Sequence, residues 1–275
     1  MSTRIAIEQL AAFAEGPFTG NPAAVCVLDQ WLPDALLQAI ASELNLSETA
    51  FVKRGTEHHD LRWFTPRCEV DLCGHATLAA AQVMFGLAPE RKALHFATRS
   101  GALQVMRNGS PDNASLNNSP LLTLDFPVQH SEPCTAPDAL IQGLGRVPES
   151  CYRGADWMAV LASEAEIRAL APDFQALEQL DGRGVIVTAP GEQVDVVSRF
   201  FAPKIGIPED PVTGSAHCSL VPYWAQRLGK QSLHAHQLSA RGGTLHCQMH
   251  GTRVRLSGRV VPFLRGTLHL PDSVT

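Results

Sequence analysis

The same order of unusual short motifs occurs twice in this chain, about half a chain apart. Phe64-Thr65-Pro66-Arg67 is followed by Cys73-Gly74-His75-Ala76, and Phe201-Ala202-Pro203-Lys204 is followed by Thr213-Gly214-Ser215-Ala216. A chain of 275 residues is long enough for two domains of ordinary size. The repeat therefore predicts two domains that share one fold and are related by pseudo-symmetry.

An apolar, helix-like segment follows each repeated motif. The first runs from Ala76 to Phe85 and stops at Gly86, and the second runs from Ala216 to Leu228 and stops at Gly229. Each glycine stands where a helix C-terminal cap is expected. Because these helices have so little polar surface, each must be enclosed by the rest of its domain.

Short segments that alternate apolar and polar residues surround both helices, as is typical of half-buried antiparallel strands. The turn-rich segment 107–120 is predicted to be an exposed loop. The predicted strands lie at residues 94–98, 103–106 and 121–126 and, as three or four strands, at 237–270. We therefore predict an α+β fold of two domains, each a curved antiparallel sheet or barrel wrapped around a buried central helix.

The boundary between the two predicted domains is placed near residue 128. This gives an N-terminal domain of residues 1–128 and a C-terminal domain of residues 129–275. Two amphipathic helices, Pro33 to Asn45 and Glu164 to Leu180, lie outside the repeated elements. We expect them to cover the sheets from outside.

Charge and hydropathy exclude several classes of partner. The 22 basic and 27 acidic residues are spread along the chain, give a net charge of −5 and form no basic run, so nucleic acid is not an expected partner. No stretch approaches the roughly 20 apolar residues of a membrane span, and the N-terminus lacks a signal-peptide core. We therefore expect a cytoplasmic protein that binds a small molecule and no membrane.

The seven cysteines are scattered without the dense spacing of a disulfide framework, and we expect them to be reduced. Cys68, Cys73 and His75, with His217-Cys218 far downstream, are residue types that can bind zinc. Their spacing does not match the usual ligand pattern of a structural zinc site. The sequence therefore predicts no metal site.

A glycine followed by a small polar or ionisable residue precedes each buried helix. These pairs are Gly74-His75 and Gly214-Ser215. Glycine lets backbone N–H groups approach a ligand closely, and a helix N-terminus favours negative charge. If both helices point their N-termini into a cleft between the domains, they would bind a carboxylate there. The alternative is that both glycines only make tight turns from strand to helix.

Three ionisable residues near these turns are candidates for catalysis, and each has a simpler explanation. Glu48 enters an apolar run, where a carboxylate must be solvated, paired or functional. His75 is a candidate proton carrier or a hydrogen-bonded histidine at a helix start. Asp210 precedes Pro211 and is also a typical turn residue. Spacing alone does not bring the three residues together.

These residues lie within segments that resemble the PhzF-like isomerases of phenazine biosynthesis, a family with the diaminopimelate epimerase fold. The segments occur in family order and extend from near residue 5 to about residue 270. They are Phe18-Thr19-Gly20-Asn21-Pro22-Ala23-Ala24-Val25, Leu46-Ser47-Glu48-Thr49-Ala50-Phe51, Phe64-Thr65-Pro66, Cys73-Gly74-His75-Ala76-Thr77 and Glu209-Asp210-Pro211-Val212-Thr213-Gly214-Ser215-Ala216.

The resemblance implies two pseudo-symmetric domains, no metal or organic cofactor, a homodimer and one active site in the interdomain cleft. By this resemblance Glu48 is the general acid/base that moves a proton between two substrate positions. His75 and Asp210 would orient the substrate or assist the proton transfer. The residues implied to bind the substrate are Ser47, Cys73, Gly74, Thr213, Gly214 and Ser215.

Two other functions stay open. Epimerases and racemases of the same fold use two cysteines on opposite faces of a chiral carbon. Here the first position is Cys73, but the repeat places Thr213 at the second, and a threonine hydroxyl does not titrate near neutral pH. A one-base epimerase using Cys73 and a non-catalytic binding protein remain alternatives.

The chain also departs from the phenazine enzyme itself. It has Cys73-Gly74-His75-Ala76 where that enzyme resembles Ala-Gly-His-Pro, and His217-Cys218 where that enzyme has small residues. The phenazine precursor is therefore not assigned as the natural substrate.

Overall fold

The computed structural model describes residues 3–108 and 120–270. Residues 109–119, most of the predicted loop at 107–120, lie outside the described residues. The chain divides into two compact units. The first unit comprises residues 1–125 and 257–275, and the second comprises residues 126–256.

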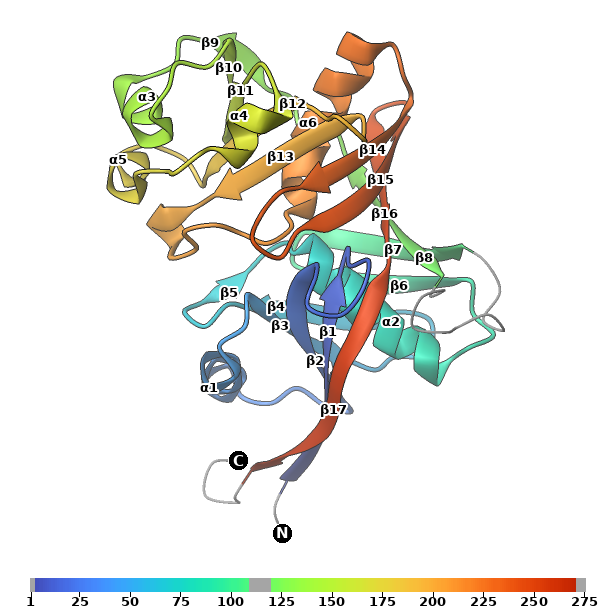
Figure 1. Ribbon diagram of the computed structural model, residues 1–275. Coiled ribbons are helices and arrows are strands. Elements are labelled where there is room, and N and C mark those ends of the chain that lie inside the picture. The colour runs from blue at the N-terminus through green and yellow to red at the C-terminus, as the bar shows by residue number, and fades with distance from the viewer. Residues whose placement is uncertain (1–2, 109–119, 271–275) are drawn as a thin grey trace. The chain divides into compact units, whose positions relative to one another are not determined.

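The first unit is a mixed sheet with one long buried helix and one covering helix (Figure 1). Its elements are β1 (Thr3–Ala12), β2 (Asn21–Leu28), α1 (Asp34–Leu44), β3 (Glu48–Lys53), β4 (His59–Phe64), β5 (Glu69–Val70), α2 (Gly74–Leu87), β6 (Ala93–Thr98), β7 (Gly101–Asn108), most of β8 (Leu121–Pro127) and β17 (Val260–Leu270).

The second unit has the same kinds of element in a similar order. They are β9 (Glu132–Cys134), α3 (Asp138–Leu144), β10 (Ser150–Arg153), β11 (Trp157–Val160), α4 (Glu164–Arg168), α5 (Phe174–Glu178), β12 (Val185–Pro190), β13 (Val196–Phe201), the 3-10 turn η2 (Pro203–Ile205), α6 (Gly214–Leu228), β14 (Ser232–Gln237), β15 (Gly243–His250) and most of β16 (Arg253–Gly258).

Strand pairing repeats between the units. In the first unit β1–β2, β3–β4 and β6–β7 are antiparallel, whereas β2–β3 and β4–β6 are parallel. In the second unit β10–β11, β12–β13 and β14–β15 are antiparallel, whereas β11–β12 and β13–β14 are parallel. The shared order confirms that the chain contains two copies of one fold.

The parallel pairs correct the prediction of purely antiparallel sheets. Each parallel pair is joined by a connection that contains a helix: α1 between β2 and β3, α2 between β4 and β6, α4 with α5 between β11 and β12, and α6 between β13 and β14. Parallel neighbours need such a crossover, because the chain must return to the same end of the sheet before the second strand begins.

Both central helices are buried, as predicted. Ala79, Ala80 and Ala81 of α2 have no exposed surface, and this helix contacts β1, β2 and β3. Trp224 of α6 is also buried, and α6 contacts β14 and β15. Helix α1 packs against β3 and β4 of the first unit, and its Leu37 belongs to the apolar core. It is therefore the covering helix that was predicted.

Two predicted helices differ from the structure. Helix α2 continues past Gly86 to Leu87, with Ala88 as its C-cap, because Pro89 disfavours a helical conformation of the residue before it. The predicted helix 164–180 is two short helices, α4 and α5. Pro172 interrupts it, and the Asp173 side chain then caps the start of α5. The second cap prediction was correct, since Gly229 ends α6 with φ +64°.

The C-terminal strand belongs to the first unit, whereas the predicted second domain extended to residue 275. Strand β17 pairs antiparallel with β1 along its length, and the two lie side by side in Figure 1. Leu268 and Leu270 of β17 pack against the core that contains Ile5 and Ile7. This burial of apolar surface holds the strand in the first unit. The other division, between Asp125 and Phe126, lies close to the expected position near 128.

Among the residues that the structure describes, no helix is long and apolar enough to cross a membrane.

Candidate active site

Glu48 and His75 form a buried pair in the first unit. Glu48 is the first residue of β3, and His75 is the second residue of α2. Glu48 Oε2 lies 3.0 Å from His75 Nε2, with side-chain exposures of 12% and 6%. The two atoms are close, but their orientation departs from that of a hydrogen bond, so the attraction is mainly electrostatic. The structure therefore brings together two of the three predicted catalytic residues.

The Nδ1 edge of the His75 ring contacts Asn21 and Cys73. The Asn21 Nδ2 atom lies 3.2 Å from His75 Nδ1, and the Cys73 sulfur lies 3.5 Å from the same nitrogen. If the amide nitrogen donates to Nδ1, the proton of a neutral His75 sits on Nε2 and faces Glu48. Once the ring is protonated, Nδ1 also carries a proton, and the Asn21 amide must turn so that its oxygen accepts it. Asn21 is fully buried at the start of β2 and therefore fixes the ring orientation.

The charges of this cluster shift the pKa values of His75 and Cys73. Burial by itself lowers the pKa of His75, but the adjacent Cys73 and the Glu48 carboxylate outweigh burial and raise it well above its ordinary value. Burial, together with the charge of Glu48, raises the pKa of the Cys73 thiol. The raised pKa of His75 favours the imidazolium form, and the raised pKa of Cys73 favours the neutral thiol.

Glu48, Cys73 and His75 also offer oxygen, sulfur and nitrogen atoms that all lie within 4.8 Å of one another. These donor types occur in zinc sites. The other residues considered for zinc are engaged elsewhere: Cys68 is exposed and contacts Thr65, and His217 Nδ1 lies 2.8 Å from the Thr213 carbonyl oxygen. The absence of a metal thus stays a prediction. Among the described residues, Glu48, Cys73 and His75 are the one group whose ligand atoms lie close enough together to bind a metal ion.

Asp210 and Thr213 are held together in the second unit, just before α6. The Thr213 hydroxyl donates a hydrogen bond to the Asp210 carboxylate. The Gln237 amide oxygen accepts a hydrogen bond from Thr213 N at 2.8 Å, and its amide nitrogen donates to the Asp210 carbonyl at 2.8 Å. Gln237 on β14 therefore fixes the turn that carries both predicted site residues.

Ser215, the second residue of α6, is hydrogen-bonded to a partly exposed arginine that forms an ion pair with a buried carboxylate. Arg183 Nη1 donates to the Ser215 hydroxyl at 3.0 Å, while Arg183 Nε donates to the Asp156 carboxylate at 3.0 Å. Asp156 is almost fully buried and accepts a second hydrogen bond from Arg183 Nη2. A cationic side chain is thus fixed at the hydroxyl group predicted to bind substrate.

The two helix starts share a further property that suits anion binding. Gly74 and Gly214 are the first residues of α2 and α6, and both are buried. The preceding residues, Cys73 and Thr213, are extended and make no side-chain cap to their helices. Thr213 is a residue type that usually caps, but its hydroxyl is used by Asp210. First-turn N–H groups without a side-chain cap are the groups that bind anions at helix N-termini.

Ser47 is half-buried directly before Glu48. The predicted site residues thus form two groups: Ser47, Glu48, Cys73, Gly74 and His75 in the first unit, and Asp210, Thr213, Gly214 and Ser215 in the second.

Comparison with known proteins now decides the family. Residues 10–266 match the model of the family described as phenazine biosynthesis-like protein, PhzC-PhzF. The chain belongs to this family. An uncharacterised isomerase from Pseudomonas aeruginosa is 52% identical to the chain over 97% of its length and 99% of the relative's length.

Solved structures agree with this assignment to the PhzF family. A PhzF-family phenazine biosynthesis protein from Enterococcus faecalis is 45% identical, covers 98% of this chain and 100% of its own, and superposes with a TM-score of 0.90. A predicted epimerase from Pseudomonas aeruginosa shares the fold at 23% identity, covering 96% of this chain and 99% of its own, with a TM-score of 0.76. The predictions of the family, the α+β fold class and an isomerase are confirmed at this level.

Sequence reasoning missed four residues that support the PhzF-like site: Asn21, Asp156, Arg183 and Gln237. Asn21 stood within a family motif, Phe18-Thr19-Gly20-Asn21, but had been given no role. The other three are far from their partners in sequence. Their only signal was that each is a polar residue next to a strand or within one.

Proposed function

We propose that this protein is a cofactor-independent isomerase of the PhzF-like family that moves a proton within a small carboxylate-bearing substrate. Glu48 is the general acid/base in this proposal. The observation that carries it is the buried contact of 3.0 Å between Glu48 Oε2 and His75 Nε2, because a carboxylate withdrawn from water and oriented by an imidazole is suited to proton transfer.

The proposed reaction needs only the groups of the chain. The Glu48 carboxylate takes a proton from a substrate carbon next to a double bond or carbonyl, and the C–H electron pair moves into the conjugated system. The resulting Glu48 carboxylic acid returns the proton to another carbon, which shifts the double bond. His75, held by Asn21, would keep the carboxylate in place and balance its charge between the two steps.

The substrate carboxylate would be bound at the helix starts. First-turn N–H groups of α2 and α6 lack a side-chain cap, and Arg183 supplies a positive charge at Ser215. The family resemblance implies that both groups of residues act on the same substrate. Asp210, fixed by Thr213 and Gln237, would then orient the polar groups of the substrate.

A one-base epimerase using Cys73 receives less support. A base at Cys73 has to be a thiolate, but burial and the charge of Glu48 raise the pKa of this thiol. The equivalent helix-cap position in the second unit is Thr213, whose hydroxyl donates to Asp210.

The test is proton exchange in D₂O, followed by NMR, with trans-2,3-dihydro-3-hydroxyanthranilate and a panel of small unsaturated or amino carboxylates. We compare wild type, Glu48→Gln and Glu90→Gln, an exposed carboxylate of the first unit. Deuterium incorporation or a shifted double bond in wild type and Glu90→Gln, but not in Glu48→Gln, supports the proposal. Equal exchange in all three proteins would place the proton carrier elsewhere, and binding without exchange would favour a binding protein.

We also propose, from the family resemblance, that the protein is a homodimer. Light scattering at the working concentration measures this directly, and a single monomeric species would contradict it.

A further inference from the structure

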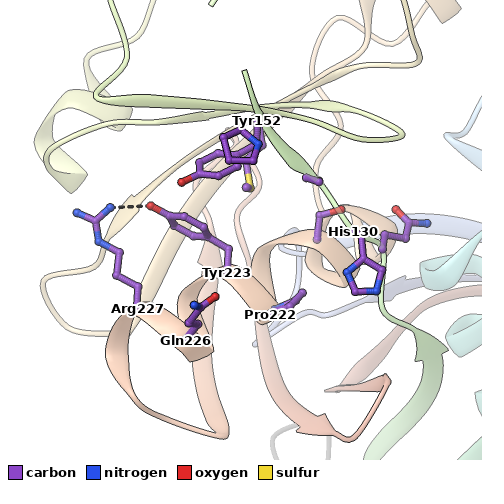
Figure 2. A pocket seen from close by; sticks show the side chains of 11 residues that line it. His130, Tyr152, Pro222, Tyr223, Gln226 and Arg227 are labelled. Atoms are coloured by element: carbon purple, nitrogen blue, oxygen red, sulfur yellow. Dashed lines mark hydrogen bonds between the residues drawn. The ribbon is translucent and has the colours of Figure 1, made fainter. Parts of the chain in front are cut away.

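A cavity of about 630 Å³ lies within the second unit, lined by residues of α6, of β9 to β11 and of the segment before β9 (Figure 2). Small-molecule sites typically have volumes of roughly 300–1,000 Å³. No residue of the proposed catalytic or substrate-binding set lines this cavity. It therefore calls for an explanation separate from the proposed isomerase reaction.

The cavity exists because the second copy of the repeat closes less completely than the first. In the first unit β1 pairs with β17 over residues Thr3 to Ala12, and both strands contact α2. The equivalent pair in the second unit is short, since β10 pairs with β9 only from Cys151 to Arg153. One face of α6 is consequently left open where the matching face of α2 is covered.

A proline inside α6 fixes the segment that borders this opening. Pro222 has no N–H group, so the helical hydrogen bond to the carbonyl of Cys218 is missing. The backbone N–H of Gln129 donates to this carbonyl oxygen instead, at 3.1 Å. The segment that carries Gln129 and His130 is thereby held at the edge of the cavity.

Two tyrosine rings form an aromatic wall. The ring centroids of Tyr152 and Tyr223 lie 5.2 Å apart at an interplanar angle of 63°, and Figure 2 shows both rings at the cavity. Arg227 Nη1 donates to the Tyr223 hydroxyl at 2.6 Å, which fixes that ring. Aromatic rings pair favourably in offset-stacked or edge-to-face arrangements, so a planar ligand ring has two partners of this kind here.

The polar lining favours an anion with a hydrogen-bond donor. Arg227 supplies a positive charge, and none of the described residues lining the cavity is acidic, although the chain carries a net charge of −5. Glu149 lies 3.9 Å from Arg227, but both side chains are about half exposed, so this pair is weak. Gln129 lines the cavity, and its amide oxygen is buried without a hydrogen-bond partner among the described residues, so a ligand donor reaches it when the side chain turns toward the cavity. A buried acceptor of this kind is costly unless a donor reaches it.

We propose that this cavity is a second small-molecule site, which binds a planar aromatic acid carrying a hydroxyl or amino group. The ring packs against Tyr152 and Tyr223, the acid group pairs with Arg227, and the hydroxyl or amino group donates to Gln129. The site is independent of Glu48 and His75, so ligand binding here does not require turnover.

The test is binding of 3-hydroxybenzoate to the full-length protein, measured by isothermal titration and saturation-transfer NMR, with neutral 3-hydroxybenzamide as the matched probe. We expect Arg227→Gln to weaken 3-hydroxybenzoate binding about tenfold, because a charge-assisted hydrogen bond is lost. Gln129→Leu should weaken both probes. Arg168→Gln removes an arginine of α4 that does not line the cavity and should change neither affinity.

Several results would overturn the proposal. The first is that neither probe binds, and the second is that the amide binds as tightly as the acid. The third is that Arg227→Gln binds 3-hydroxybenzoate as wild type does. A fourth is an affinity that rises as the protein is diluted, which would show that a second copy of the chain covers the cavity. Unchanged melting temperatures of the variants exclude loss of fold as the cause of weaker binding.

Discussion

Arg183 donates a hydrogen bond to the Ser215 hydroxyl at 3.0 Å while it holds the buried carboxylate of Asp156. Arg183 thus connects the start of α6 to Asp156, whose carboxylate accepts two hydrogen bonds from the guanidinium group. This geometry requires the planar guanidinium group. A lysine ammonium cannot form the bidentate pair with Asp156 and, at the same time, the hydrogen bond to Ser215.

Arg183→Lys should therefore reduce kcat/KM by about tenfold or more, mainly through KM, because the charge stays but its direction is lost. Steady-state kinetics on the substrate found by the exchange assay measures this effect. Arg153→Lys, a change of another arginine of the second unit, is the control. An unchanged KM in Arg183→Lys would show that Arg183 supports only the fold.

The pair of Glu48 and His75 predicts a specific dependence of stability on pH. The pKa of His75 is raised above its ordinary value of 6.5, so its contribution to stability is fully present below 6.5 and is lost as pH rises through the folded-state pKa. His75→Gln should lower the free energy of unfolding more at pH 6 than at pH 9. Urea unfolding at both values measures the difference.

His95→Gln, at an exposed position of β6, serves as the control for this pH dependence and should show no such trend. A destabilisation by His75→Gln that grows with pH would contradict the assigned direction.

A change of Cys73 distinguishes the proposed isomerase, which uses Glu48, from the alternative epimerase, which uses Cys73. If Glu48 carries the proton, Cys73→Ala should keep proton exchange within about tenfold of wild type, because the thiol contacts His75 but does not itself transfer the proton. An epimerase that uses Cys73 would lose nearly all exchange in the same assay. Cys247→Ala, a buried cysteine of the second unit, controls for the effect of a small cavity.

The cluster of Glu48, Cys73 and His75 also allows a direct test of metal independence. We expect exhaustive dialysis against EDTA to leave proton exchange unchanged, because the proposed reaction uses only side chains. Elemental analysis of the protein before and after dialysis provides the control. Loss of activity that added zinc restores would instead assign these three residues as ligands.

A buried hydrogen bond in the second unit should contribute measurably to stability. The Trp224 indole N–H donates to the Thr188 hydroxyl at 2.9 Å, and this hydroxyl donates to the Val197 carbonyl at 2.8 Å. Thr188→Val leaves the buried Trp224 indole N–H without its acceptor and should cost about 1–3 kcal/mol, measured by urea unfolding. Ser100→Ala, at an exposed turn, should cost much less. A loss below about 0.5 kcal/mol in Thr188→Val would contradict this role.

Features encoded in adjacent residues could be predicted from the sequence. The repeated motifs, the apolar helix after each of them and the covering helix at 33–45 depend on local periodicity and on cap residues, which a sequence displays directly. The glycine at each helix start was visible for the same reason. Glu48 was recognisable as a candidate, although only the family resemblance connected it with His75.

The remaining features depend on pairs that are distant in the chain. The pairing of β17 with β1, the contact of Asn21 with His75 and the hydrogen bond of Arg183 to Ser215 join segments whose local patterns do not specify a partner. The sequence alone determined the duplicated fold and the family, because both are encoded in local motifs and their order. Only the tertiary structure decided which polar groups meet, because burial forces each of them to find a partner wherever the packed core places one.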